Sequence, residues 1–137
     1  MHRSFFAVKD TFINSGSDLI NGTTFTDKNV GQDEILELKK TFDNKELRGV
    51  TRTLIQFNTD EIKNYITASN VPNNYKIFLR LYEASGTSGL SDEYTIAANP
   101  LTESWDEGVG KEADDPKTTE GCSWEFRRNS QNFKEIR

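Results

Sequence analysis

The feature that most constrains the fold is the stretch 49–62, GVTRTLIQFNTDEI, in which a strand pattern runs directly into a helix start. Its first half is rich in β-branched residues, which favour strands. Its second half places Asn58 three residues before Glu61, the spacing of a capping box that satisfies the first free amides of a helix. The helix that follows has an apolar face formed by Ile62, Tyr65 and Ile66. The sequence therefore predicts a buried strand over 49–57 and one short helix near 59–68.

Other segments alternate apolar and polar side chains, the period-two pattern of a half-buried strand. They cover residues 5–13, 34–40, 75–83, 94–98 and 122–126. Phe6, Val8 and Phe12 are the expected core residues of the first of them. The pattern is clearest in 75–83: Tyr75, Ile77, Leu79 and Leu81 share one face, and Lys76, Phe78, Arg80 and Tyr82 share the other.

A chain of 137 residues is normally one domain, and short strands without alternating long helices are typical of all-β folds. We therefore expect a single all-β domain over 1–137, an antiparallel β-sandwich or jelly roll with one short helix. Hydrophobic residues make up only 34% of the chain, but nine Phe, four Tyr and two Trp supply large buried areas. That aromatic content argues against intrinsic disorder.

The net charge of the chain limits the classes of binding partner that we expect. The net charge is −5 and the pI is near 4.9, and the 17 basic residues form no stripe. We therefore expect no nucleic-acid partner, because such binding depends on Lys and Arg displacing counterions from phosphates. Anionic membrane surfaces are disfavoured for the same reason. No segment approaches the ~20 apolar residues that cross a bilayer, and the first residues lack a signal-peptide pattern.

The residues that carry enzyme chemistry are sparse. His2 is the only histidine and lies at the terminus, which disfavours a catalytic triad or a histidine zinc site. Cys122 is the only cysteine, so no intrachain disulfide is expected and the thiol is interpreted as a small buried apolar group. Acidic pairs such as Asp92-Glu93 lie in loops, where they lack the apolar pocket that a glycosidase acid requires. We expect that the chain is not an enzyme and binds no cofactor apart from a candidate calcium ion.

That calcium site would use the acidic loop after Trp105. Asp106, Glu107, Asp114 and Asp115 offer the hard oxygen ligands that Ca²⁺ prefers. Their spacing does not match an EF-hand loop, and the alternative interpretation is a solvated acidic loop.

Three aromatic side chains are candidates for contact with a partner or a glycan. Trp105 lies in a loop corner, where we expect it to be open. Phe78 and Tyr82 lie on the polar-patterned face of 75–83, where a second sheet, the helix or another subunit would cover them. Trp124 alternates with Glu125 and is expected in the core.

The order of four short motifs resembles a known family. These motifs are Asp10-Thr11-Phe12-Ile13, RTLIQF at 52–57, LRLY at 79–82 and ESWDE at 103–107. In this order they resemble the DNRLRE-type jelly-roll domains, which are related to carbohydrate-binding modules. Such domains occur in secreted bacterial surface proteins and in bacteriophage structural proteins. The resemblance spans about Asp10 to Trp124 and implies a jelly roll.

The family usually continues with further strands, whereas this chain ends soon after Trp124. Either the chain is truncated at its C-terminal side, or a neighbouring subunit completes the sandwich by strand addition. The missing secretion pattern favours the phage branch. The resemblance thus implies a virion structural protein, made in host cytoplasm, that docks in multiple copies to other tail, neck, baseplate or capsid proteins. The alternative is an adhesin-like carbohydrate-binding module that recognises a glycan through loop aromatics.

Overall fold

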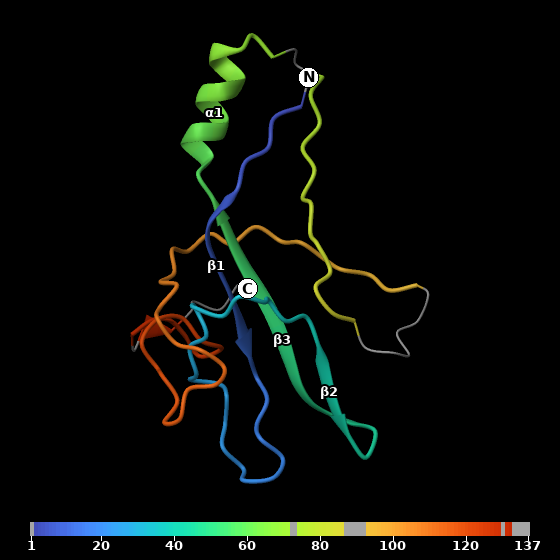
Figure 1. The fold of residues 1–137 in the computed structure, drawn as a ribbon, viewed down its shortest axis with the longest axis vertical. Helices are drawn as coiled ribbons and strands as arrows, with labels where there is room; N and C mark the ends of the chain where they lie inside the picture. The colour runs from blue at the N-terminus through green and yellow to red at the C-terminus, as the bar shows by residue number, and fades with distance from the viewer. Residues whose placement is uncertain (1, 72–73, 87–92, 130, 133–137) are drawn as a thin grey trace. The chain divides into compact units, whose positions relative to one another are not determined.

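The computed structural model describes residues 2–71, 74–86, 93–129 and 131–132 (Figure 1). Two compact units divide the chain. The sheet unit combines Met1–Asn58 with Glu103–Arg137, and the helix unit is Thr59–Thr102. The single domain expected over 1–137 stays a prediction.

The sheet unit is built on a three-stranded antiparallel sheet in the order β1-β3-β2. Its strands are β1 (Ala7–Asn14), β2 (Lys40–Asp43) and β3 (Glu46–Phe57). Phe12 of β1 lies opposite Thr53 of β3. A two-residue turn joins β2 to β3, with Asn44 and Lys45 at φ 48° and 67°. Positive φ at both turn residues matches the twist of the flanking strands, so this hairpin forms from local sequence.

The stretch 49–62 forms the strand and the helix that the sequence predicts, but most of the strand is half-buried or exposed rather than buried. β3 ends at Phe57 and α1 (Thr59–Ala68) begins two residues later, as the sequence predicts. Within α1, Ile62, Tyr65 and Ile66 are half-buried while Lys63 is exposed, which is the expected amphipathic pattern. The first predicted strand, 5–13, is likewise observed as β1.

The prediction of a strand over 34–40 is wrong. Only Lys40 belongs to a strand, and 34–39 has no regular secondary structure. Side-chain hydroxyls of β3 replace part of the ladder there. The Thr51 hydroxyl accepts the Lys39 amide at 2.7 Å, and the Thr53 hydroxyl donates to the Glu37 carbonyl at 3.4 Å. The segment runs beside β3 without regular pairing.

The predicted strand over 122–126 begins later than expected. β4 (Phe126–Arg128) pairs antiparallel with β5 (Gln131–Asn132), and 122–125 is irregular. A tight turn causes the shift: the Ser123 amide donates to the Phe126 carbonyl at 2.7 Å, and the Phe126 amide donates to the Ser123 hydroxyl at 3.1 Å.

The two strands predicted in the helix unit, 75–83 and 94–98, are also not formed. Alternation fits a strand, but a strand exists only where a neighbouring backbone satisfies its amides and carbonyls. In Figure 1 the segment from Asn74 to Gly86 is an extended trace without an arrow. The hairpin loop expected at 85–89, between these two predicted strands, lies partly outside the described residues.

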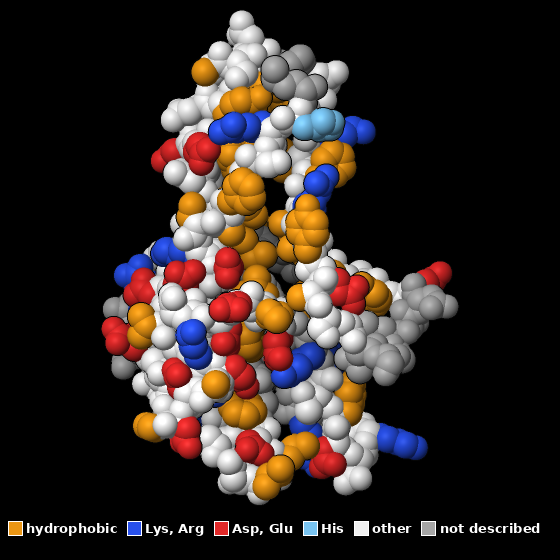
Figure 2. All heavy atoms as spheres, viewed as in Figure 1, with side chains coloured by type: hydrophobic (Ala, Val, Ile, Leu, Met, Phe, Trp, Pro, Cys, Tyr) orange, Lys and Arg blue, Asp and Glu red, His pale blue; other side chains and the backbone are white. Residues whose placement is uncertain are grey.

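Strands are the main regular secondary structure among the described residues, which contain one short helix and an antiparallel sheet, in agreement with the all-β class. The strands form one three-stranded sheet and one two-stranded pair. On the face seen in Figure 2, acidic and basic side chains are interspersed rather than gathered by sign.

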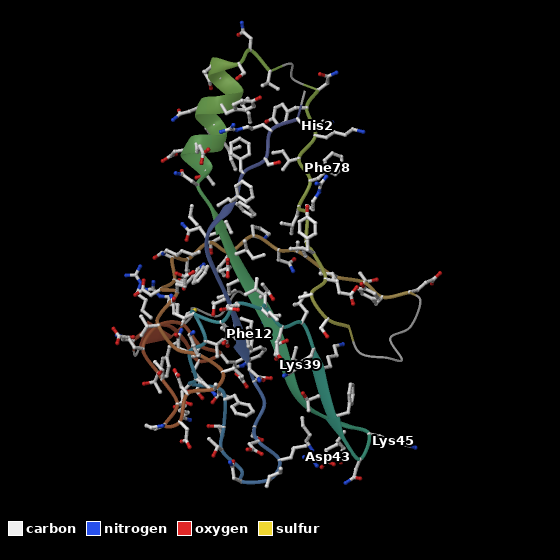
Figure 3. The ribbon with its side chains drawn as sticks, viewed as in Figure 1. His2, Phe12, Lys39, Asp43, Lys45 and Phe78 are labelled. Atoms are coloured by element: carbon white, nitrogen blue, oxygen red, sulfur yellow. The ribbon has the colours of Figure 1, made fainter. Side chains whose placement is uncertain are left out.

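The core of the sheet unit lies where loops cover β1. Thr11, Phe12 and Ile13 are all buried, so both faces of β1 are covered at this point (Figure 3). Ile13 packs with Trp105 and Cys122, and Leu54 and Trp124 contact this cluster. Phe12 and Trp124 confirm the sequence expectation. Phe6 and Val8, in contrast, are exposed, because they precede the part of β1 that the loops cover.

Candidate functional site

A buried asparagine joins three loops of the sheet unit. The Asn29 side chain is 0% exposed and uses its full hydrogen-bonding capacity. Its amide nitrogen donates to the carbonyls of Glu107 and Cys122, each at 2.8 Å. Its amide oxygen accepts the backbone amides of Gly31 and Gly110, at 3.2 and 2.9 Å. We call Asn29 with these bonded backbone groups the Asn29 node.

Glycines allow the backbones of the Asn29 node to approach this closely. A Cβ on Gly31 would overlap the carbonyl oxygen of Glu107. Gly121 has φ +112°, and a Cβ there would lie 2.5 Å from the Asn29 amide nitrogen. The backbone amide of Asn29 also donates to the Thr118 carbonyl at 2.8 Å. The Asn29 node is a fully bonded junction between closely packed backbones.

The same loops cover the outer edge of β1. The Glu107 carboxylate accepts the Asp10 amide at 2.9 Å, and the Lys9 ammonium donates to the Trp105 carbonyl at 3.1 Å. Because these groups occupy the edge, β1 offers no free amide at Asp10 for strand addition.

The four candidate calcium ligands are not brought together. Among the described residues, which include all four, no group of three or more His, Cys, Asp or Glu side chains is arranged to hold a metal. Glu107 is bonded to β1. Asp106 lies 3.7 Å from the Arg128 guanidinium, and Asp114 accepts bonds from the Lys111 amide and the Thr118 hydroxyl. Asp115 is exposed. Calcium binding stays a prediction that this arrangement does not favour.

Two acids of this loop have shifted pKa values in opposite directions. The bond from Thr118, followed by the bond from the Lys111 backbone, holds the pKa of Asp114 below its usual range. Burial raises the pKa of Glu112, and Lys28 partly opposes this shift.

Cys122 behaves as the small apolar group expected from sequence. It is fully buried, and burial raises the pKa of its thiol to about 12. A thiol is nucleophilic only as the thiolate, so Cys122 is chemically inert in the folded chain.

The two tryptophans both belong to the core. Trp105 is 3% exposed, which corrects the expectation that it is open in a loop corner. Its ring contacts Ile13 and Cys122, and Lys9 lies over it at 5.6 Å. Arg52 lies over the Trp124 ring at 4.8 Å. Neither ring offers a free face of the kind on which a sugar could stack.

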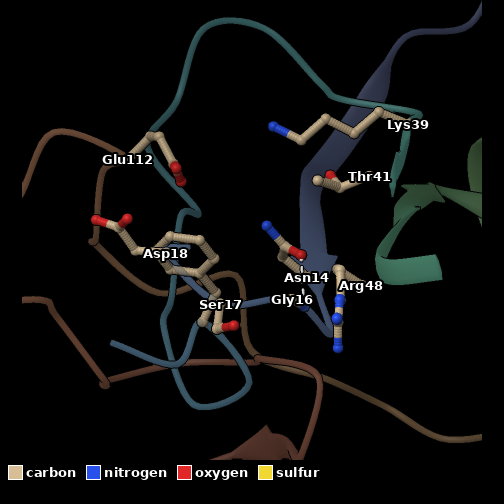
Figure 4. Close-up of a pocket in the computed structure, with 9 residues that line it drawn as sticks. Asn14, Gly16, Ser17, Asp18, Lys39, Thr41, Arg48 and Glu112 are labelled. Carbon is tan, nitrogen blue, oxygen red and sulfur yellow. Dashed lines mark hydrogen bonds between the residues drawn. The ribbon is translucent and has the colours of Figure 1, made fainter. Parts of the chain in front are cut away.

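An open hollow of about 290 Å³ lies in the sheet unit, at the end of β1 (Figure 4). Its polar and aromatic lining comes from Asn14, Ser17, Asp18, Phe25, Lys39, Thr41, Arg48 and Glu112. The Asn14 oxygen already accepts the Gly16 amide at 2.8 Å, which leaves its nitrogen as a donor on the hollow. Arg48 is paired with Glu46 at 2.9 Å, and Lys39 with Glu37. We call this feature the β1 hollow.

Among the residues that the structure describes, the longest row of uncovered apolar side chains lies in the helix unit. Phe78 and Tyr82 are 81% and 83% exposed. The row also includes Tyr75, Ile77, Leu79 and Leu81, each about half exposed or more. We call these six side chains the apolar row. Figure 3 places Phe78 on the extended segment. The structure thus leaves two of the three predicted contact residues exposed and buries the third.

Sequence reasoning missed both the Asn29 node and the β1 hollow. Asn29 reads locally as a loop residue before Gly31, and its partners lie some 80 to 90 positions away. The sequence signal for the Asn29 node is the set of Gly108, Gly110 and Gly121, since glycines indicate that backbones approach closely.

No protein family model, curated protein or solved structure matches this chain. No helix among the described residues has both the length and the apolar character needed to cross a membrane.

Proposed function

We propose that this chain is a structural component of a bacteriophage virion, a jelly-roll module that docks to other tail, neck, baseplate or capsid proteins. The observation that carries the proposal is the apolar row, in which Phe78 and Tyr82 are more than four-fifths exposed. Contiguous uncovered apolar surface is uncommon on monomeric proteins and is typical of interfaces. The motif order that resembles DNRLRE-type domains supports the virion setting.

The sandwich belongs to this proposal as well. The sheet β1-β3-β2 supplies one antiparallel layer, and the unformed segments 75–83 and 94–98 carry the alternation of further strands. Strand pairing with neighbouring polypeptide would satisfy their backbone groups. The mechanism is repeated protein–protein contact, without catalysis.

Incorporation into particles tests the docking proposal. A chain with Phe78→Asp and Tyr82→Asp replaces the wild type during particle production, and its copy number is measured in purified virions. We expect at least a tenfold loss, because two buried charges at an interface cost several kcal/mol. The matched control is Ile20→Asp, which charges a 97% exposed apolar side chain of the sheet unit. Wild-type incorporation of the double variant, or absence of the chain from virions, would contradict the proposal.

A carbohydrate-binding module is the second candidate, and the β1 hollow is the observation that favours it. Phe25 supplies an apolar ring beside Asn14, Asp18 and Lys39, the combination of ring and polar groups that binds polyhydroxylated ligands. Binding on a glycan array should be lost with Phe25→Ala and Asp18→Ala. It should persist with Phe42→Ala, an exposed ring outside the hollow. Binding that these variants leave unchanged would remove this candidate.

A further inference from the structure

We propose that Tyr75–Glu83 is a self-association strand, which pairs antiparallel with the same segment of a second copy of this chain, centred on Leu79. The inference rests on the docking function proposed above and names one partner for the apolar row. Its basis is a segment with strand alternation, no ladder, and exposed apolar side chains on both of its faces.

The exposed area fits a subunit contact. The six side chains of the apolar row present on the order of 800 Å², since an aromatic side chain alone offers about 150–250 Å². A standard interface buries about 800 Å² per partner, and edge-to-edge pairing of two strands covers only part of the exposed area. A contact between identical patches is also the commonest way in which homodimers form.

The register follows from the charges. Antiparallel pairing about Leu79 places Phe78 opposite Arg80 of the other copy and Lys76 opposite Tyr82. Each cation then faces an aromatic ring, and residues directly opposite in an antiparallel pair lie on the same face. On the other face, Ile77 meets Leu81 and Leu79 meets its own copy.

The neighbouring registers that keep two-fold symmetry between the copies are worse. Centring the pair on Phe78 places Lys76 opposite Arg80, and centring it on Arg80 places that guanidinium opposite its own copy. A parallel in-register pair also places each cation opposite its own copy. Like charges directly opposite each other destabilise a ladder, so the register about Leu79 is selected.

The other strand edges that the structure shows are less suited to pairing with a second copy. The edge of β1 is covered at Lys9 and Asp10, and β2 is only four residues long. An isolated two-stranded ribbon is only marginally stable in water, so we expect pairing that depends on protein concentration.

Cysteine cross-linking of the full chain tests the register. With Leu79→Cys, the two thiols lie opposite each other, at a Cα separation of about 4.5–5.5 Å that a disulfide can bridge. Under mild oxidation we expect a covalent dimer. Ile77→Cys alone should not form one, because its copies would lie about 14 Å apart. Mixed Ile77→Cys and Leu81→Cys chains should cross-link again. Buried Cys122 does not interfere.

Sedimentation velocity on the unmutated chain supplies an independent readout. We expect a monomer–dimer equilibrium that Arg80→Glu weakens by about 5- to 30-fold, because two cation–π pairs are lost at about 0.5–1 kcal/mol each. The matched control is Lys45→Glu, the same charge change in the exposed β2–β3 turn, which should leave the equilibrium unchanged.

A monomer at every concentration overturns the inference, as does equal cross-linking at positions 77 and 79. Slow amide hydrogen exchange over 75–83 in a monomer would show that the segment pairs within one chain. That result also overturns the inference. If the chain does not self-associate but its incorporation into particles still depends on Phe78, only this inference is removed. Self-association without any effect of Phe78→Asp and Tyr82→Asp on incorporation would remove only the docking function.

Discussion

The Asn29 node and the apolar row differ in how far their side chains are buried and bonded within the chain. In the node, every polar atom of a fully buried side chain has a backbone partner within the chain. In the apolar row, Phe78 and Tyr82 have four-fifths of their surface in water. One region has its polar groups bonded within the chain, and the other leaves apolar side chains uncovered. The comparison separates residues that hold the fold from residues that are available for contact.

Removing the donor of the Asn29 node should have the largest effect on stability. Asn29→Asp keeps the shape but turns the group that bonds the Glu107 and Cys122 carbonyls into a buried, unpaired charge. We expect a loss of about 3–5 kcal/mol in the free energy of unfolding. Urea titration followed by the fluorescence of Trp105 and Trp124 measures it.

Asn21→Asp is the matched control. The side-chain oxygen of Asn21 accepts the Thr23 amide in an exposed turn, and Asp retains that oxygen. We expect a change within about 0.5 kcal/mol. Equal effects at positions 21 and 29 would show that the node does not hold the sheet unit together.

Filling the space beside the Asn29 node should have the next largest effect. Gly31→Ala introduces a Cβ that overlaps the Glu107 carbonyl, so the loops must separate, at a cost of about 2–3 kcal/mol. Gly22→Ala has nothing within 4 Å but must adopt φ +73°, for which we expect about 1 kcal/mol. The difference between the two midpoints in urea isolates the steric contribution, and no difference would argue against the close packing.

Lowering the pH should reveal a smaller contribution to stability, from Asp114 in the loop that joins the Asn29 node. The folded-state pKa of Asp114 is below its usual value of 3.8, so its bonds stabilise the fold above that value and stop doing so as pH falls through the folded pKa. Asp114→Asn should therefore lower stability at neutral pH, and the gap to wild type should close in acid.

Thr118→Val removes the main donor to Asp114 and should reproduce part of this pH dependence. Glu120→Gln, at an exposed acid of the same loop, is the control. Unfolding curves across the acid range measure all three variants. A gap for Asp114→Asn that does not change with pH would contradict the assignment.

The apolar row should give the smallest effect on the stability of the sheet unit. Phe78→Ser removes an apolar ring that is mostly in water, so we expect a change below about 0.5 kcal/mol in dilute solution. The tryptophan signal reports this because Trp105 and Trp124 both lie in the sheet unit. A loss of 2 kcal/mol or more, by the scale of buried large-to-small changes, would show that Phe78 is a core residue.

The features that were predicted correctly depend on residues close together in the sequence or on residue type. The strand ending at Phe57, the helix beginning at Thr59 and the buried Cys122 all follow from short patterns or from residue type. The Asn29 node could not be predicted because its bonds join residues far apart in the chain. The alternation of 75–83 indicated a strand, but pairing depends on a partner backbone that the pattern does not specify. Trp105 was misplaced because a loop residue can still lie in the core.

Amide hydrogen exchange on the full chain, at low and at high protein concentration, tests the central contrast most directly. The account predicts slow exchange at Gly31, Gly110 and the other bonded amides of the Asn29 node at both concentrations. It predicts fast exchange over 75–83 in dilute solution and protection there as the concentration rises. Strong protection of 75–83 in the dilute monomer, or rapid exchange in the node, would contradict it.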